Sequence, residues 1–172
     1  TRPCRCQWRI FSYRFSRLRP FFIFKKNGKK RVICVPTVSD RLVQRTIVQH
    51  ISTNDRLKLL NEVSYGFVSG DEKGVQSAIK KAMHLRAQHE WVLKTDIQSF
   101  FDDIDRPLLK KKIERRLGHS SLVPLLLAAV DSEIRTTSQS DRTELAALGI
   151  RTGWGLRQGM PLSPLLSNFV LS

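Results

Sequence analysis

Carboxylates are concentrated in one short stretch of this chain. Four of them fall within ten residues: Asp96, Asp102, Asp103 and Asp105. Asp96 follows the run Trp91-Val92-Leu93-Lys94-Thr95, which is expected to form a short buried strand at 91–95. A carboxylate that ends a buried strand is costly unless it faces a cleft, pairs with a cation or binds a metal ion, and magnesium prefers such oxygen ligands. A helix cap is the structural alternative for Asp96, and turn or capping roles explain the other three.

A second stretch, residues 155–168, combines glycines with a helix start. Gly155 and Gly159 flank Gln158, and Ser163-Pro164 has the order of an N-cap followed by a first helical position. Glycine lets a backbone approach a ligand closely, and a helix N-terminus favours phosphate. Taken alone, a capped loop explains this stretch equally well.

Basic side chains are concentrated at the start of the chain. Thirty Lys and Arg face fifteen Asp and Glu, for a net charge of +15, and residues 1–39 hold eleven of the basic side chains and no carboxylate. Such clustering favours a polyanionic partner, and nucleic acid more than a membrane surface. Neither the three cysteines nor the four histidines have zinc-ligand spacing, and no apolar run reaches transmembrane length, so a cytoplasmic protein with free thiols is expected.

The elements that must position these residues can be predicted from periodicity and breaker residues. An aromatic stripe predicts a helix at 8–18, docked by its rings or clamping nucleic acid with its arginines. Strands at 21–24 and 31–35 flank Asn27-Gly28, a strong hairpin signal, which places the basic stretch 25–30 on the hairpin tip. Helices are expected at 40–60 (capped by Asp40), 74–90, 105–118, 120–134 and from Ser163 onward, with a loop, alone or with a hairpin, at 135–157.

Together these blocks resemble the reverse transcriptase family over about residues 20–172. Asp96 with Phe100-Phe101-Asp102 is similar to its first catalytic motif, and Gln158-Gly159 with Ser163-Pro164 and Asn168 to its template and nucleotide grip. Two upstream blocks, Arg31 to Gln44 and Tyr65 to Gly70, resemble the bacterial branch that includes group II intron, retron, CRISPR-associated and phage-defence enzymes.

The resemblance implies an α+β polymerase right-hand fold, with fingers and an incomplete palm whose antiparallel sheet packs on helices. Residues 1–19 would be a basic N-terminal helical segment, 20–90 the fingers, and 91–172 a partial palm. The family's second catalytic Asp-Asp motif and its thumb are missing, so they are expected in the rest of the same chain or in another chain. The apolar residues after Pro164 would then form an exposed patch: Leu165, Leu166, Phe169 and Val170.

The implied activity is RNA-directed DNA synthesis with two Mg²⁺ ions (Mn²⁺ is possible), an RNA template, a DNA or RNA primer and dNTPs. Asp96 and the Ile97 carbonyl would bind metal, and Phe101 would act as the steric gate that rejects ribonucleotides. The dNTP would also meet Gln158, Gly159, Arg31 and a lysine of the hairpin, where Lys25, Lys26 and Lys29 are indistinguishable. Nucleic acid would contact Lys30, Arg5, Arg9, Arg14, Ser163 and Pro164.

Two other functions are considered. A polymerase-like subunit that only binds nucleic acid or a partner is the main alternative. An RNA-dependent RNA polymerase is disfavoured, because that class commonly keeps a second Asp five positions after the first, where this chain has Phe101.

Overall fold

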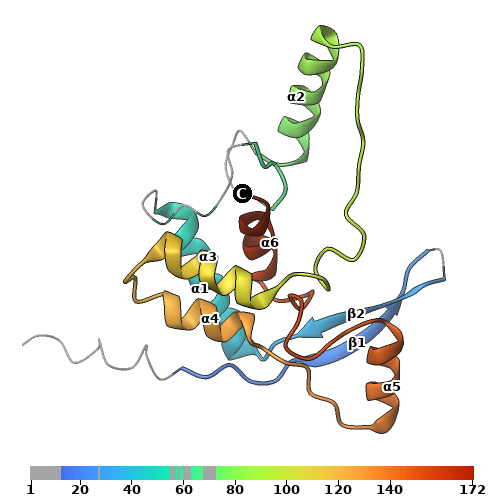
Figure 1. Cartoon of the computed structure of the whole chain (residues 1–172), viewed down its shortest axis with the longest axis vertical. Coiled ribbons are helices and arrows are strands. Elements are labelled where there is room, and N and C mark those ends of the chain that lie inside the picture. The colour runs from blue at the N-terminus through green and yellow to red at the C-terminus, as the bar shows by residue number, and fades with distance from the viewer. Residues whose placement is uncertain (1–12, 27, 55–56, 58, 60–62, 68–72) are drawn as a thin grey trace, which may run out of the picture.

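The computed structural model describes residues 13–26, 28–54, 57, 59, 63–67 and 73–172. These residues form a two-stranded antiparallel sheet and six helices, a mixed α and β fold (Figure 1). The elements are β1 (Arg19–Phe24), β2 (Lys30–Val35), α1 (Val38–Thr53), α2 (Val75–Gln88), α3 (Arg106–Leu117), α4 (Val123–Val130), α5 (Gln139–Ala147) and α6 (Ser163–Leu171).

The predicted hairpin is confirmed. β1 pairs with β2 in a register that sets Phe22 opposite Val32, and the side chains of Val32 and Cys34 are buried. At the turn, the Gly28 N–H donates to the Lys25 carbonyl over 2.9 Å, and Gly28 has a φ of +76° that favours glycine. The lysines of the tip therefore project from a defined turn.

The predicted helix at 8–18 is wrong over its described part, and residues 8–12 lie outside the described residues. Residues 13–17 are not helical: the Ser16 N–H donates to Asp40 (3.2 Å) in place of a helix carbonyl, and the Tyr13 hydroxyl donates to the same carboxylate (2.7 Å). Leu18 bonds instead with residues 133 and 135, in a bridge to Ile134. The cap of α1 also differs from the prediction, since Thr37 accepts from the Asp40 N–H and Asp40 lies inside the helix.

The main core lies between four helices. Ile47 and Ile51 of α1, Ile113 of α3 and Leu126 of α4 belong to one buried cluster. Three residues of α6 join it with at most 3% of their surface exposed: Leu165, Leu166 and Phe169. The predicted exposed patch on this helix is therefore wrong, because α1, α3 and α4 already supply the apolar surface that covers it.

The predicted strand at 91–95 is also wrong. Residues 91–97 belong to no strand, and Trp91 and Leu93 are each 90% exposed. No described strand lies beside them, so their backbone has no ladder to join. Figure 1 shows this stretch running extended from α2, which stands away from the body and has no buried residue, back toward α3.

The predicted helix boundaries agree with the observed ones where a capping residue determines the helix end. α3 begins after Asp105, whose side chain accepts from the Leu108 N–H, and it ends at Gly118. α1 ends at Thr53, earlier than predicted. α5 lies within the predicted loop at 135–157, where Ser138 and Asp141 form a capping box.

Candidate functional site

A cavity of about 350 Å³ lies between β2, the start of α1 and residues 158–164. The structure brings six of the predicted site residues together in its lining: Arg31, Phe101, Gln158, Gly159, Ser163 and Pro164. They come from segments that are far apart in sequence, so the fold, and no single motif, builds the cavity.

The loop that carries Gln158 is docked onto β2. The Cys34 N–H donates to the Gln158 carbonyl over 2.7 Å. At Gly159, φ is +107°, and a Cβ would lie 2.7 Å from the Cys34 carbonyl oxygen. Only glycine allows this approach, so residue 159 sets the distance between the loop and the strand.

The loop that carries Phe101 is held by the same segment. The Leu156 N–H donates to the Phe101 carbonyl over 2.7 Å, and the Gly155 N–H donates to Ile104 over 2.9 Å. Gly155 has a φ of +72°, and a Cβ there would lie 2.6 Å from the Asp102 carbonyl oxygen. These contacts fix Phe101 relative to Gln158.

Glu133, Arg106 and Arg157 form an ionic cluster next to these loops, and both of its arginines are buried. Glu133 accepts from Arg106 over 2.6 Å and from Arg157 over 2.9 Å, and Arg106 also donates to the Gly155 carbonyl over 2.8 Å. Burial raises the pKa of Glu133, but hydrogen bonds from Gly153 and Arg157 and the charges of both arginines outweigh it, so the pKa is lowered overall. Glu133 therefore stays ionised. Its negative charge compensates the two buried arginines, which would otherwise lack a charged partner.

Asp102, next to Phe101, is half-buried and lies in a basic environment. Burial raises the pKa of this carboxyl, and Asp103 adds to the effect, while Arg157, Arg31 and Lys25 oppose it. Cations of the hairpin and of the loop that carries Gln158 therefore act on the Asp102 carboxyl, which is partly removed from solvent.

Ser163 does not cap α6 as predicted. Its hydroxyl donates to the Arg157 carbonyl over 2.7 Å, and Leu162 occupies the capping position without a side-chain hydrogen bond. The side chain of Ser163 is 1% exposed, so its main role is to tie the helix start to the loop.

Sequence reasoning missed two arginines of the cavity. Arg41 and Arg45 lie one turn apart on α1 and line it together with Arg31. Within the described part of the chain, none of these three arginines forms an ion pair, and the lining contains no carboxylate. The signal for them in the sequence was their four-residue spacing, which places both side chains on one face of a helix. Phe67, Met160 and Pro161 complete the lining.

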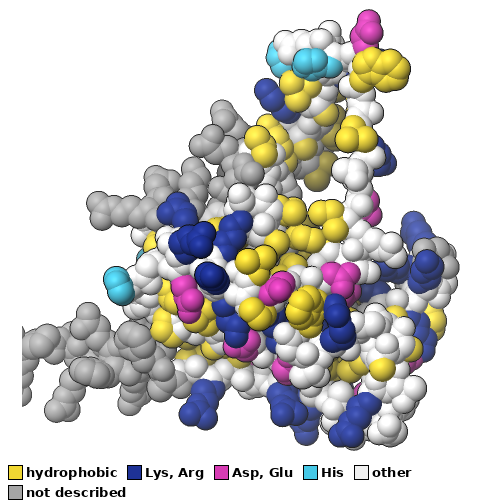
Figure 2. All heavy atoms as spheres, viewed as in Figure 1, with side chains coloured by type: hydrophobic (Ala, Val, Ile, Leu, Met, Phe, Trp, Pro, Cys, Tyr) yellow, Lys and Arg dark blue, Asp and Glu magenta, His cyan; other side chains and the backbone are white. Residues whose placement is uncertain are grey.

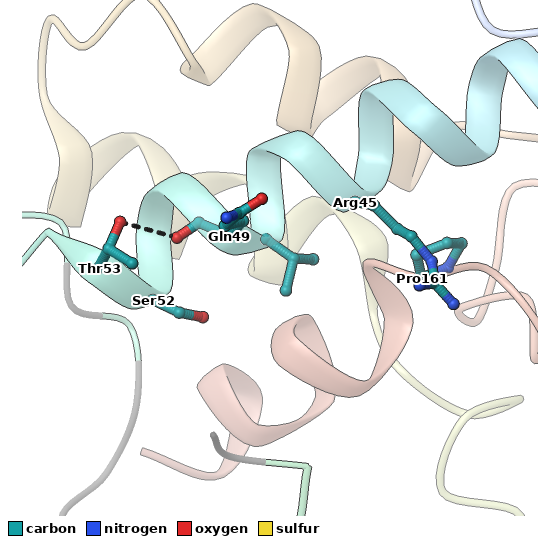
Figure 3. A pocket seen from close by; sticks show the side chains of 6 residues that line it. Arg45, Gln49, Ser52, Thr53 and Pro161 are labelled. Atoms are coloured by element: carbon teal, nitrogen blue, oxygen red, sulfur yellow. Dashed lines mark hydrogen bonds between the residues drawn. The ribbon is translucent and has the colours of Figure 1, made fainter. Parts of the chain in front are cut away.

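A second hollow, of about 460 Å³, continues from this cavity along α1 (Figure 3). It shares Arg45 and Pro161 with the cavity and extends past Gln49 to Ser52 and Thr53. Figure 3 shows these side chains following one side of α1, above α6. The two hollows therefore adjoin at Arg45 and Pro161, and three polar side chains lie along the second one, from Gln49 to Thr53.

The predicted lysines lie outside the cavity lining. Lys25, Lys26 and Lys29 are exposed near the hairpin tip, where Lys and Arg side chains gather in Figure 2. Lys30 pairs with Glu144 of α5 and lies 5.6 Å from the Phe24 ring centroid. Arg14 is exposed, whereas Arg5 and Arg9 lie outside the described residues.

The predicted metal ligands do not make up a metal site by themselves. Asp96 and Ile97 are exposed and do not line the cavity. The described residues contain no group of three His, Cys, Asp or Glu side chains that could hold a metal ion. One carboxylate and one carbonyl fall short of the six oxygens that Mg²⁺ prefers, so this assignment stays a prediction.

Known proteins match most of this chain. Protein YkfC of Escherichia coli K12 is 30% identical over 162 residues, which cover 90% of this chain and 39% of YkfC. The group II intron-encoded protein LtrA of Lactococcus lactis subsp. cremoris is 28% identical over 155 residues, 90% of this chain and 24% of LtrA. The chain thus spans well under half the length of these relatives.

Solved structures match at the level of the fold. A chain of a partial Cas6-RT-Cas1–Cas2 complex superposes with a TM-score of 0.50 at 23% identity, over 92% of this chain and 25% of that chain. Among the described residues, no helix has the length and apolar character to cross a membrane. The family model for reverse transcriptase (RNA-dependent DNA polymerase) matches residues 23–172, and the chain belongs to that family.

Proposed function

We propose that this chain forms the fingers (20–90) and the front part of the palm (91–172) of an RNA-directed DNA polymerase, and that its cavity holds the incoming dNTP. The observation that carries the proposal is the convergence of Arg31, Phe101 and Gln158 on one cavity whose described lining residues include no carboxylate. The volume of about 350 Å³ suits a small ligand of this class.

The triphosphate would meet the arginines. Arg31, Arg41 and Arg45 approach from two elements, and guanidinium groups form strong, charge-assisted hydrogen bonds with phosphate oxygens. The start of α6 at Ser163-Pro164 adds a helix N-terminus to the same cavity, which also favours negative charge. Lys25 is one of the cations whose charge acts on Asp102, next to Phe101, so a hairpin lysine would also lie near the phosphates.

The sugar would meet Phe101. Phe101 lines the cavity, and the Leu156 N–H holds its backbone carbonyl, which fixes the backbone that carries the ring. A fixed aromatic ring leaves no room for a 2′-hydroxyl, which would select dNTPs over ribonucleotides. Gln158, held to β2 through its carbonyl, would contact the nucleotide from the opposite loop.

The template would follow the hollow along α1. Arg45 lines both hollows, and the polar side chains of Gln49, Ser52 and Thr53 line the second hollow beyond it. Arginine and uncharged polar side chains of this kind contact phosphate and sugar without reading sequence. The similarity to LtrA, a group II intron-encoded protein, favours RNA as the template.

Metal ions would complete the active centre. Asp96 and the Ile97 carbonyl would offer oxygen ligands to Mg²⁺ or Mn²⁺, and two-metal phosphoryl transfer requires further ligands beyond these. The palm sheet that normally surrounds such carboxylates, and the thumb, would come from the rest of the same chain or from another chain. The solved complex of Cas6-RT-Cas1 with Cas2 is one example of a neighbour with partner chains.

A second candidate is a subunit that only binds nucleic acid or a partner protein. The exposed Trp91, Val92 and Leu93 favour it, because apolar side chains in a row are typical of a surface that another chain covers. Primer extension with Mg²⁺ on an RNA template, using the polypeptide that contains this chain, separates the two. Synthesis that Asp96→Asn abolishes supports the polymerase, and RNA binding without such synthesis supports the binding subunit.

A further inference from the structure

Another cavity lies on the α5 side of the molecule. It has a volume of about 320 Å³, and among the described residues it shares no lining residue with the proposed dNTP cavity. Its walls come from residue 17, residues 133–136, helix α5 and residues 150–157. The resemblance to polymerase motifs assigns nothing to this cavity, so its chemistry must be inferred from the lining itself.

The lining carries surplus positive charge. Arg17, Arg142 and Arg157 contribute to it, and Glu133 is the one carboxylate in the lining among the described residues. Glu133 is already bound by Arg157 and by Arg106 behind it. Arg17 and Arg142 are exposed and form no ion pair within the described part of the chain. The charge of the cavity is therefore not compensated by the protein.

Arg157 is only half satisfied. It is 3% exposed, and its Nη2 donates to Glu133 over 2.9 Å and to the Arg151 carbonyl over 2.7 Å. Its Nε and Nη1 are buried and have no hydrogen-bond partner. Unmatched charged donors are costly in a buried position, and an anion beside this wall would offset the cost.

The rest of the lining is suited to an organic group. Ile134, Leu145 and Ile150 form an apolar wall, and the hydroxyls of Thr136 and Thr152 lie in the same lining. A bare anion would leave the apolar wall unused, whereas a phosphate ester with a planar ring would use both halves. The volume is at the lower end of the range for small-molecule sites.

We propose that this cavity binds a phosphate-bearing ligand of mononucleotide size. The phosphate would lie against Arg17 and Arg142 in the field of Arg157, and the base would pack on Ile134, Leu145 and Ile150. Two sources offer this chemistry, a free nucleotide and a nucleotide within an RNA strand. The site stands apart from the proposed dNTP cavity and does not depend on polymerase activity.

Isoleucine methyl NMR tests the proposal on the folded chain. Ile134 and Ile150 report on this cavity, and Ile33, whose Cγ2 is 2.8 Å from the position of a Cβ on Gly159, reports on the dNTP cavity. Titration with AMP or a short RNA should shift Ile134 and Ile150 saturably. Arg17→Glu and Arg142→Glu, both at exposed positions, should each weaken that binding about tenfold or more. Arg135→Glu, exposed and outside the lining, should leave it unchanged.

The outcomes separate the possible sources and the possible failures. If AMP shifts Ile134 and Ile150, the natural ligand is a free nucleotide. If the short RNA shifts them and AMP does not, the natural ligand is a nucleotide within an RNA strand. The proposal is overturned if neither ligand shifts Ile134 and Ile150, if the shifts survive both charge reversals, or if inorganic phosphate binds as tightly as AMP. Shifts of Ile33 that depend on Arg31 test the dNTP cavity separately.

Discussion

The backbone N–H of Leu156 donates a 2.7 Å hydrogen bond to the carbonyl of Phe101. This contact joins the loop within the carboxylate stretch to the loop that carries Gln158, although 55 positions separate the two residues. The ring that is proposed to select the sugar is therefore positioned by the segment that is proposed to hold the nucleotide.

Two glycines with the same backbone conformation test this positioning. Gly155 and Gly153 both have a φ of +72°, but a Cβ at Gly155 would clash with the Asp102 backbone, whereas a Cβ at Gly153 would meet nothing within 4 Å. Gly153→Ala should cost about 1 kcal/mol from backbone strain alone. Gly155→Ala should cost clearly more in urea unfolding. Equal losses would mean that the approach of residue 155 to Asp102 is not tight.

The ionic cluster predicts a pH-dependent stability. The pKa of Glu133 is lowered in the folded chain from its ordinary value of 4.5, so its stabilisation is complete above that value and is lost as the pH falls through the folded pKa. Glu133→Gln should lower the free energy of unfolding at pH 7 by about 3 kcal/mol, because two buried arginines lose their partner. The deficit relative to the parent should shrink as the pH falls below about 4.5.

Glu114→Gln is the matched control for this experiment. Its side chain is exposed on α3 and is outside the cluster, so its unfolding free energy should stay near that of the parent across the same pH range. A deficit of Glu133→Gln that does not depend on pH would contradict the role of its ionised form.

The residues that line the two hollows should contribute differently to nucleotide binding and to template binding. Arg31 lines only the cavity, Gln49 lines only the hollow along α1, and Arg45 lines both. Arg31→Ala should raise the KM for dNTP about tenfold, as expected for loss of a charge-assisted hydrogen bond. Gln49→Ala should weaken RNA binding alone, and Arg45→Ala should affect both. An Arg45→Ala enzyme with normal RNA affinity would argue against the template path.

The hairpin lysines should contribute to RNA binding through phosphate contacts. Replacing Lys25, Lys26 and Lys29 with Ala should flatten the log–log salt dependence of RNA affinity by up to roughly 3, at about 0.9 or less per lost contact. Replacing Lys80, Lys81 and Lys111, which are exposed on α2 and α3, provides a control of equal charge. Equal changes in both triple variants would show that only net charge matters.

Local signals predicted the elements that local chemistry controls. Asn27-Gly28 predicted the hairpin, Asp105 and Gly118 bounded α3, and the glycines beside Gln158 indicated a close backbone approach. Ser138 and Asp141 carried a capping signal for α5 that was overlooked.

Signals that depend on distant partners failed. The run at 91–95 has the composition of a buried strand, but strand formation requires a neighbouring strand, which no described residue supplies. Asp40 has the side chain of a cap, yet Tyr13 and Ser16 recruit it from 27 and 24 positions away. Glu133 has no motif around it, and only the fold reveals that it joins Arg106 to Arg157.

The most direct test of the central claim is nucleotide selection by Phe101. Primer extension on an RNA template, by the enzyme that contains this chain, gives the ratio of catalytic efficiencies for a dNTP and the matching rNTP. Phe101→Ala should lower that ratio at least tenfold by admitting ribonucleotides, while Phe100→Ala, at the neighbouring ring outside the cavity lining, should preserve it. An unchanged ratio in an active Phe101→Ala enzyme would contradict the placement of the dNTP in this cavity.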